Sequence, residues 1–188
     1  MKICGYAAII FFVLSIRSFA IGDALKFDSL DRGQHTISLS AGYSENHRIP
    51  TSMRIRFTSD VIKLRVGQFT SPRTEISYEL VGGQQIKNLD GYSISGLIGY
   101  RRYFIMRGST ALSYDLGIGG IHLGEKIEGL ATRNNFTEYV GFTLQHAVGD
   151  ASAMNIEYRF SHISNAGIKK PNVGINSSIV MIGYSWYK

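Results

Sequence analysis

The 188-residue chain is poor in cysteine and proline, and its charge is not concentrated in one place. Its single cysteine, Cys4, excludes an intramolecular disulfide scaffold. With three prolines and scattered glycines it is neither a low-complexity nor a collagen-like chain, and its length excludes a multi-domain enzyme. The formal net charge is +6, but the basic residues are spread out. Because phosphate binding needs basic residues close together, we expect no nucleic-acid partner.

Metal and phosphate motifs are also missing. The histidines outside the C-terminal region have no metal-ligand spacing and no cysteine companions; they are His35, His47, His122 and His146. The glycine-rich run 117–120 lies in an expected strand with no helical pattern after it, so it suits close packing inside a narrow barrel better than phosphate binding. We expect neither a metal nor a cofactor.

Long hydrophobic runs are absent except at the N-terminus. Residues 3–16 form an apolar run after Lys2, and Ser18-Phe19-Ala20 provides a small-x-small cleavage site. The run is short for a membrane-spanning helix, and the layout is that of a secretory signal peptide. We predict a signal peptide over 1–20 and an N-terminal periplasmic lead-in over 21–34, with an uncleaved anchor as the alternative.

From residue 35 onward, apolar and polar residues alternate, as is typical of β-strands. In the first run, Ile37 and Leu39 share one face and Ser38 and Ser40 the other. The strands are predicted over residues 35–43, 51–67, 75–81, 92–101, 111–120, 135–145, 152–164 and 176–187. The alternation predicts an all-β fold, with an eight-stranded barrel over 35–188. One apolar stripe, in 135–145, is interrupted by Glu138.

The phase of the alternation slips within 51–67, between Thr58 and Val61. A β-bulge in one long strand explains the slip, because an extra residue reverses the facing of the residues that follow. Two short strands with a turn at Ser59-Asp60 are the alternative.

The two faces of the strands indicate the kind of barrel. One face carries charges of both signs, which must pair when buried; it comprises Arg54, Arg56, Lys63, Arg65, Glu75, Glu79, Asp115, Glu157 and Arg159. The other face is apolar and suits lipid. Aromatic residues near strand ends suit an interfacial girdle; they are Tyr43, Tyr92, Tyr184 and Trp186. This pattern disfavours a soluble barrel that carries an apolar ligand.

Short and long connections alternate along the chain, which is typical of outer-membrane barrels. The short ones are 68–73, 105–109 and 148–151, and the long ones are 44–50, 83–91, 122–133 and 165–175. We therefore predict an antiparallel transmembrane β-barrel in the outer membrane of a Gram-negative type of cell, with both termini periplasmic.

The stretch 157–176 places polar residues on the face that is otherwise apolar. His162 and Ser164 continue the stripe of Tyr158 and Phe160, and Asn176 falls on the same face of the next strand. With periplasmic termini, these residues lie at the external rim. Polar side chains on a lipid-facing surface are costly, so their convergence needs an explanation.

Ester hydrolysis is one explanation. Ser164 would be the nucleophile, His162 its base, and Asn176 the residue that holds the imidazole tautomer. Residues two apart in a strand are roughly 6.5–7 Å apart, a gap that an imidazole can cover where the strand begins to distort. Asn165 and Gly167 in the following loop would supply oxyanion donors. The alternative is an ordinary polar rim with a tight loop, and the residue types alone favour it.

The run RFSHISNAGIKKPNVGIN, residues 159–176, resembles the motif of the outer-membrane lipid A 3-O-deacylases, the PagL or acyloxyacyl hydrolase family. Weaker similarity covers most of the remaining chain, including Asn135-Phe136-Thr137. The resemblance implies an eight-stranded barrel that removes the 3-hydroxyacyl chain at position 3 of lipid A without a metal. It places the family's catalytic histidine and serine on His162 and Ser164, and its oxyanion-hole residues on Asn165 and Gly167.

The family's acid, a glutamate in its best-described members, falls on Asn176. An asparagine can accept a hydrogen bond from the imidazole and orient it, but it cannot neutralise the imidazolium, so a slower enzyme is expected. Glu157 is not a substitute, because its odd position points it into the lumen. Lys169 and Lys170 are candidates for contact with lipid A phosphates, or a solvated pair.

The leading interpretation is a carboxylic ester hydrolase of the lipid A 3-O-deacylase type, acting on lipopolysaccharide in the outer leaflet. A catalytically weak or inert outer-membrane barrel with a structural or surface-interaction role is the alternative. The sequence leaves open whether the protein forms a homodimer.

Overall fold

The structure is a computed structural model that describes residues 25–47, 56–87 and 90–188. The predicted signal peptide and the residues 51–55 lie outside the described residues. A 3₁₀ helix, η2 (Phe27–Ser29), precedes the strands β1 (His35–His47), β2 (Thr58–Ser71), β3 (Thr74–Lys87), β4 (Gly91–Arg107), β5 (Thr110–Leu123), β6 (Asn134–Gly149), β7 (Ser152–Ser164) and β8 (Ile175–Tyr187).

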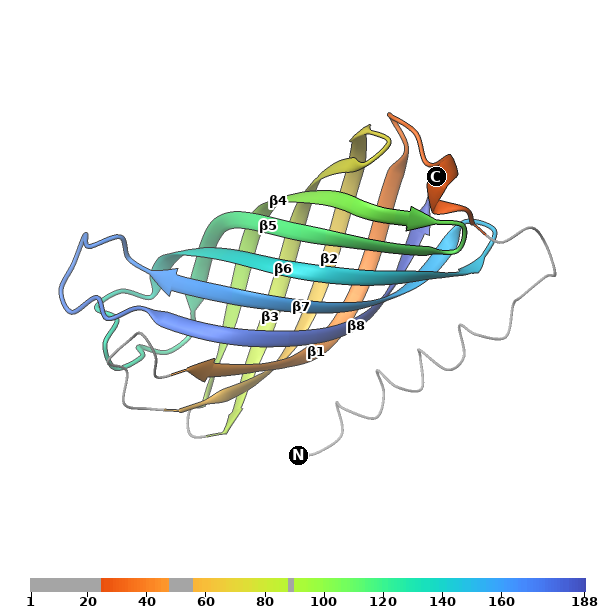
Figure 1. The fold of residues 1–188 in the computed structure, drawn as a ribbon. Coiled ribbons are helices and arrows are strands. Elements are labelled where there is room, and N and C mark those ends of the chain that lie inside the picture. The colour runs from red at the N-terminus through yellow and green to blue at the C-terminus, as the bar shows by residue number, and fades with distance from the viewer. Residues whose placement is uncertain (1–24, 48–55, 88–89) are drawn as a thin grey trace.

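The strands form a closed barrel in which each pairs with the next along the chain and β8 pairs with β1, all antiparallel (Figure 1). The predicted eight-stranded antiparallel barrel is confirmed. Closure leaves no free sheet edge, so every strand finds backbone partners on both sides.

Most strands extend beyond the alternating runs, so most connections are shorter than predicted, although the first one, 48–57, is longer than the predicted 44–50. The residues between strands at one end, the turn end, are 72–73, 108–109 and 150–151. At the other end, the loop end, they are 48–57, 88–90, 124–133 and 165–174. The C-terminus and η2 lie at the turn end (Figure 1). The predicted alternation of short and long links is therefore present, although 88–90 is short.

The described part of the segment 51–67 differs from both interpretations of the sequence. β2 runs unbroken through Ser59 and Asp60, so the alternative with a turn there is wrong. The register against β3 does shift between Thr58 and Ser59, but the unpaired residue is Ile86 on β3. Phe57 precedes the strand and is buried by packing at the loop end, where the strand alternation does not apply.

The interior is charged, as the alternation predicts. Ion pairs join Lys63, Arg65, Arg101 and Arg159 with Glu75, Glu79, Asp115 and Glu157, each at most 4% exposed. Arg101 Nε lies 2.5 Å from Asp115 Oδ1, and Arg159 Nη1 lies 2.7 Å from Glu79 Oε2. The placement of Arg56 in this lumen is wrong, because it precedes β2 and is exposed. Arg54 lies outside the described residues.

Apolar clusters close both ends of this interior. At the turn end, Phe27 and Leu30 of the lead-in pack with Phe69, Tyr103 and Tyr187. At the loop end, Leu123, Ile127, Leu130 and Ile175 pack with Phe57. The barrel is thus a filled structure with a polar middle and apolar ends.

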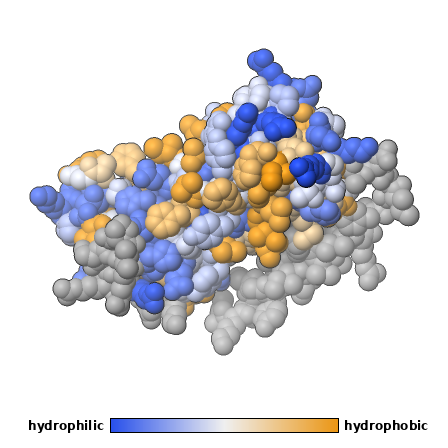
Figure 2. Space-filling model, viewed as in Figure 1, coloured by the Kyte–Doolittle hydropathy of each residue, from blue (hydrophilic) through white to orange (hydrophobic). Residues whose placement is uncertain are grey.

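The outer face is apolar. Large hydrophobic side chains on every strand are exposed, among them Ile62, Tyr78, Ile98, Ile118 and Ile182. Figure 2 shows apolar residues across the middle of the visible face, with hydrophilic residues at either end. No helix among the described residues is long and apolar enough to cross a membrane. Tyr43, Tyr92 and Trp186 are exposed near strand ends, as expected for an interfacial girdle.

Candidate active site

The pleat of β7 decides which way the motif residues face. Glu157, Arg159 and Ser161 are buried inside the barrel, so His162 and Ser164 point outward. Asn176 on β8 lies directly opposite His162 in the antiparallel register and therefore shares its face. His162 and Ser164 are half-buried, and Asn176 is 3% exposed. All three residues lie at the loop end, on the outer surface.

A hydrogen bond orients the imidazole. His162 Nδ1 lies 2.6 Å from Asn176 Oδ1. A carbonyl oxygen can only accept a hydrogen bond, so the ring donates from Nδ1 and the lone pair remains on Nε2. This is the tautomer that a base needs if Nε2 is to take a proton from a hydroxyl.

Gly174 packs against the other edge of the same ring. A Cβ built on Gly174 would lie 2.7 Å from His162 Cε1 and 3.3 Å from Nε2, and the residue has a φ of +76°. Both the contact and the backbone conformation require glycine. Nothing in the sequence indicates this contact between Gly174 and the ring.

Within the part of the chain that the structure describes, the Ser164 hydroxyl forms fewer hydrogen bonds than the His162 imidazole or the Asn176 carboxamide. Ser164 follows His162 by two residues on the same face and lies opposite Phe136 of β6. Among the described residues, no hydrogen bond joins its hydroxyl to the imidazole. The strand rise separates the two positions, so the two side chains must lean together for proton transfer.

The loop after Ser164 is held by the Asn165 side chain. Its Nδ2 donates to the Lys169 carbonyl at 2.7 Å, and its Oδ1 accepts from the Gly167 N–H at 3.0 Å. Its own backbone N–H donates to Asn172 Oδ1 at 2.9 Å. Asn165, 2% exposed, therefore organises a tight loop, and the candidate oxyanion donors Asn165 and Gly167 are bonded to the loop itself.

A second loop braces this one. Leu130 of the 124–133 loop forms an isolated β-bridge with Asn172, and the Ala131 N–H donates to the Pro171 carbonyl at 3.0 Å. The Val173 N–H donates to the Gly129 carbonyl at 2.9 Å. Lys169 and Lys170 are exposed in the braced loop. The site is thus attached to a rigid rim.

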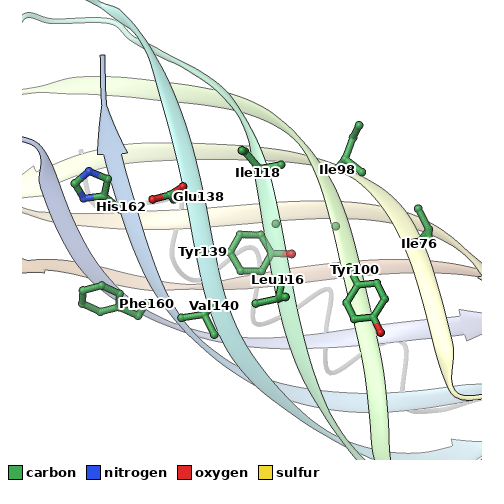
Figure 3. A pocket seen from close by; sticks show the side chains of 12 residues that line it. Ile76, Ile98, Tyr100, Leu116, Ile118, Glu138, Tyr139, Val140, Phe160 and His162 are labelled. Carbon is green, nitrogen blue, oxygen red and sulfur yellow. The ribbon is translucent and has the colours of Figure 1, made fainter. Parts of the chain in front are cut away.

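A groove of about 530 Å³ crosses the outer surface from His162 toward β3. Figure 3 shows His162 and Glu138 at one end and Ile76 at the other. Apolar side chains from three strands, β4, β5 and β6, line it between these ends: Ile98, Leu116, Ile118 and Val140. Gly117 forms part of its lining, and a Cβ there would lie 2.1 Å from the Tyr139 ring. The glycine-rich run therefore serves close packing.

Two residues that flank the His162–Asn176 pair were not selected from the sequence as site residues. Glu138 was noticed only as a break in an apolar stripe, but it lies directly opposite His162 on β6. His47, on β1, pairs with Asn176 from the other side, and its Nε2 lies 2.7 Å from Ser178 Oγ. Barrel closure places β1 beside β8, and the sequential β6–β7 pairing places β6 beside β7, so Glu138 and His47 lie on either side of the β7–β8 hairpin.

No metal-binding group is present in the described ranges: no three His, Cys, Asp or Glu side chains there are arranged to hold an ion.

The charged interior, apolar exterior and outward histidine–serine–asparagine cluster define the class: an outer-membrane β-barrel with a candidate hydrolase site. The chain matches the family model described as Lipid A 3-O-deacylase (PagL) over residues 51–185, and it belongs to that family. It therefore resides in the outer membrane of the Gram-negative type, and its family acts on lipid A.

The solved structures that resemble this fold include three outer-membrane or surface proteins. Neisserial surface protein A (NspA) is 11% identical, with a TM-score of 0.66 over 82% of this chain and 98% of its own. The outer membrane enzyme PagL is 18% identical, with a TM-score of 0.58 over 79% and 97%. OprG from Pseudomonas aeruginosa is 8% identical, with a TM-score of 0.55 over 86% and 98%. No curated protein sequence matches the chain.

Proposed function

We propose that this protein is a lipid A 3-O-deacylase that hydrolyses the ester-linked 3-hydroxyacyl chain at position 3, in the outer leaflet. One observation carries the proposal: in a chain of this family, the His162–Asn176 hydrogen bond sets an imidazole on the lipid-facing surface at the end of an apolar groove. A lipid ester can reach that surface by lateral diffusion, without leaving the membrane.

Ser164 and His162 carry the chemistry. Ser164 Oγ attacks the ester carbonyl carbon while His162 Nε2 takes the hydroxyl proton. The tetrahedral intermediate collapses, the bond to the sugar oxygen breaks, and the imidazolium returns the proton to that oxygen. Water, deprotonated by the same imidazole, then attacks the acyl carbon; the bond to Ser164 Oγ breaks, the imidazolium returns the proton to that oxygen, and the fatty acid is released. Asn176 keeps Nε2 free throughout by accepting from Nδ1.

Asn165 and Gly167 stabilise the oxyanion. A carboxamide has two N–H bonds, and the Lys169 carbonyl takes one from Asn165. The second is the donor for the oxyanion, and the Gly167 N–H joins it when substrate replaces its bond to Asn165 Oδ1.

The substrate lies along the surface. The acyl chain occupies the groove, where Ile98, Ile118 and Val140 replace contacts with neighbouring lipids. Lys169 and Lys170 face the lipid A phosphates from the loop above, at a depth where charged headgroups lie.

Mass spectrometry of lipid A from cells with and without the protein tests the proposal. We expect the loss of one 3-hydroxyacyl chain, which Ser164→Ala and His162→Asn abolish. Ser178→Ala is the matched control, because Ser178 is an outward serine hydrogen-bonded to a different histidine, His47; it should retain activity. If Ser178→Ala abolished activity and Ser164→Ala did not, the nucleophile would be Ser178, with His47 as its base.

The inert barrel is the second candidate, and the asparagine at position 176 favours it. Unchanged lipid A in cells whose outer membrane contains the folded protein would support it and contradict the enzyme.

A further inference from the structure

Glu138 is a charged residue in an apolar setting. It points outward from β6 and is exposed. Along its own strand the neighbours on that face are Phe136 and Val140, and on β5 the residue directly opposite is Ile118. On its other side, on β7, the residue directly opposite is His162.

This position is unfavourable for a carboxylate unless it has a partner. A charge on the lipid-facing surface of a barrel is costly, and more so away from the rim. Directly opposed residues of an antiparallel pair have Cβ atoms about 4.5–5.5 Å apart, within reach of a glutamate and an imidazole. Figure 3 shows the Glu138 side chain beside the His162 ring, at the end of the groove.

We propose that Glu138 supplies the negative charge that Asn176 lacks, as a positioning residue that acts through His162. The inference rests on the proposed function. Asn176 orients the ring through Nδ1, while Glu138 stabilises the positive charge that forms when Nε2 takes the proton of Ser164. The proton stays on the imidazole until it passes to the leaving sugar oxygen, so Glu138 remains a carboxylate.

The barrel topology allows one residue to orient the imidazole and another to stabilise its positive charge. β7 lies between β6 and β8, so His162 has one neighbour from each. The neighbour from β8, Asn176, is uncharged, and the neighbour from β6, Glu138, carries a negative charge. Glu157 cannot take the role, because it faces the interior, where it is bonded to Lys63 and Arg159.

A double-mutant cycle on the full-length protein in lipid A micelles tests the proposal. Glu138→Gln removes the charge and keeps the shape, and Asn176→Asp puts a carboxylate on His162 Nδ1 with the same shape. In the native chain we expect Glu138→Gln to lower kcat by about ten- to a hundredfold, with KM little changed, because it loses one close charge interaction in a medium of low dielectric constant. In the Asn176→Asp chain the same change should cost less than about threefold, because the second carboxylate supplies the charge.

Asp60→Asn is the matched control, since Asp60 is an exposed acidic residue on the outer face of β2, away from the site; it should leave kcat unchanged. An equal loss from Glu138→Gln in both backgrounds would make the role of Glu138 structural and overturn the inference. So would an unchanged kcat in the native chain. Lipid A left intact by the native chain itself would instead overturn the proposed function, which separates the two failures.

Discussion

Two residues restrain the imidazole of His162, and a third lies opposite it. Asn176 bonds its Nδ1, Gly174 contacts its Cε1 edge, and Glu138 lies opposite on the neighbouring strand. A base that must reach a hydroxyl two residues along the strand needs this restraint, because a displacement of about 1 Å can cost roughly a hundredfold in rate.

Gly174→Ala should therefore damage catalysis more than folding. The new methyl group would lie 2.7 Å from His162 Cε1, and the ring has to move away. We expect kcat to fall by about ten- to a hundredfold, while the heat-modifiable migration of the folded barrel in gel electrophoresis is retained. Steady-state hydrolysis of lipid A measures the first effect.

Gly33→Ala is the control for backbone strain alone. Gly33 has a φ of +92° but no atom within 4 Å of its Cβ position, and it lies before β1, in the lead-in at the turn end. The Gly33→Ala variant should have a lower free energy of unfolding and an unchanged kcat. Equal activity losses in the two alanine variants would contradict a direct contact between residue 174 and the catalytic ring.

At the scale of elements, the proposed function assigns acyl-chain binding to β4, β5 and β6 and the reacting groups to β7 and β8. The groove crosses these strands between successive rows of outward side chains. Its lining comes from residues far apart in sequence that the register sets side by side, such as Ile98, Ile118 and Glu138. Lipid contact alone would not require a groove that ends at the imidazole.

Ile118→Trp should fill the middle of this groove. We expect KM for lipid A with long acyl chains to rise by about tenfold, with a smaller effect for short chains, because the ring occupies the path of the acyl chain. Ile182→Trp places the same side chain on the outer face of β8, outside the groove, and should have little effect. A similar change in KM for both variants would argue against an acyl chain in the groove.

For the whole molecule, the charges inside the barrel are structural. The acidic and basic residues of the interior are joined in ion pairs, and apolar clusters close both ends. A buried pair contributes little by itself, but removing one member leaves the other unpaired. The rigid wall that carries the outer-face site depends on this network.

Glu157→Gln should lower stability more than turnover. Glu157 is 1% exposed and bonded to both Lys63 and Arg159, so its loss should cost about 3–5 kcal/mol. Urea unfolding in lipid vesicles would show the lower midpoint, and turnover per folded molecule should stay within about twofold of the native value. Reduced turnover with an unchanged midpoint would contradict the inward assignment.

The sequence by itself determined the barrel, its inner and outer faces, and the outward direction of His162, Ser164 and Asn176. These follow from strand alternation, a local property with a period of two residues. The alternation gave a wrong prediction for Arg56 and for the segment 51–67, because the start of β2 depends on pairing with other strands. Only the tertiary structure placed Gly174 on the imidazole edge, Glu138 opposite His162, and the groove beside them. The physical reason is that cross-strand register depends on hydrogen bonds between segments separated by tens of residues, which no local pattern encodes.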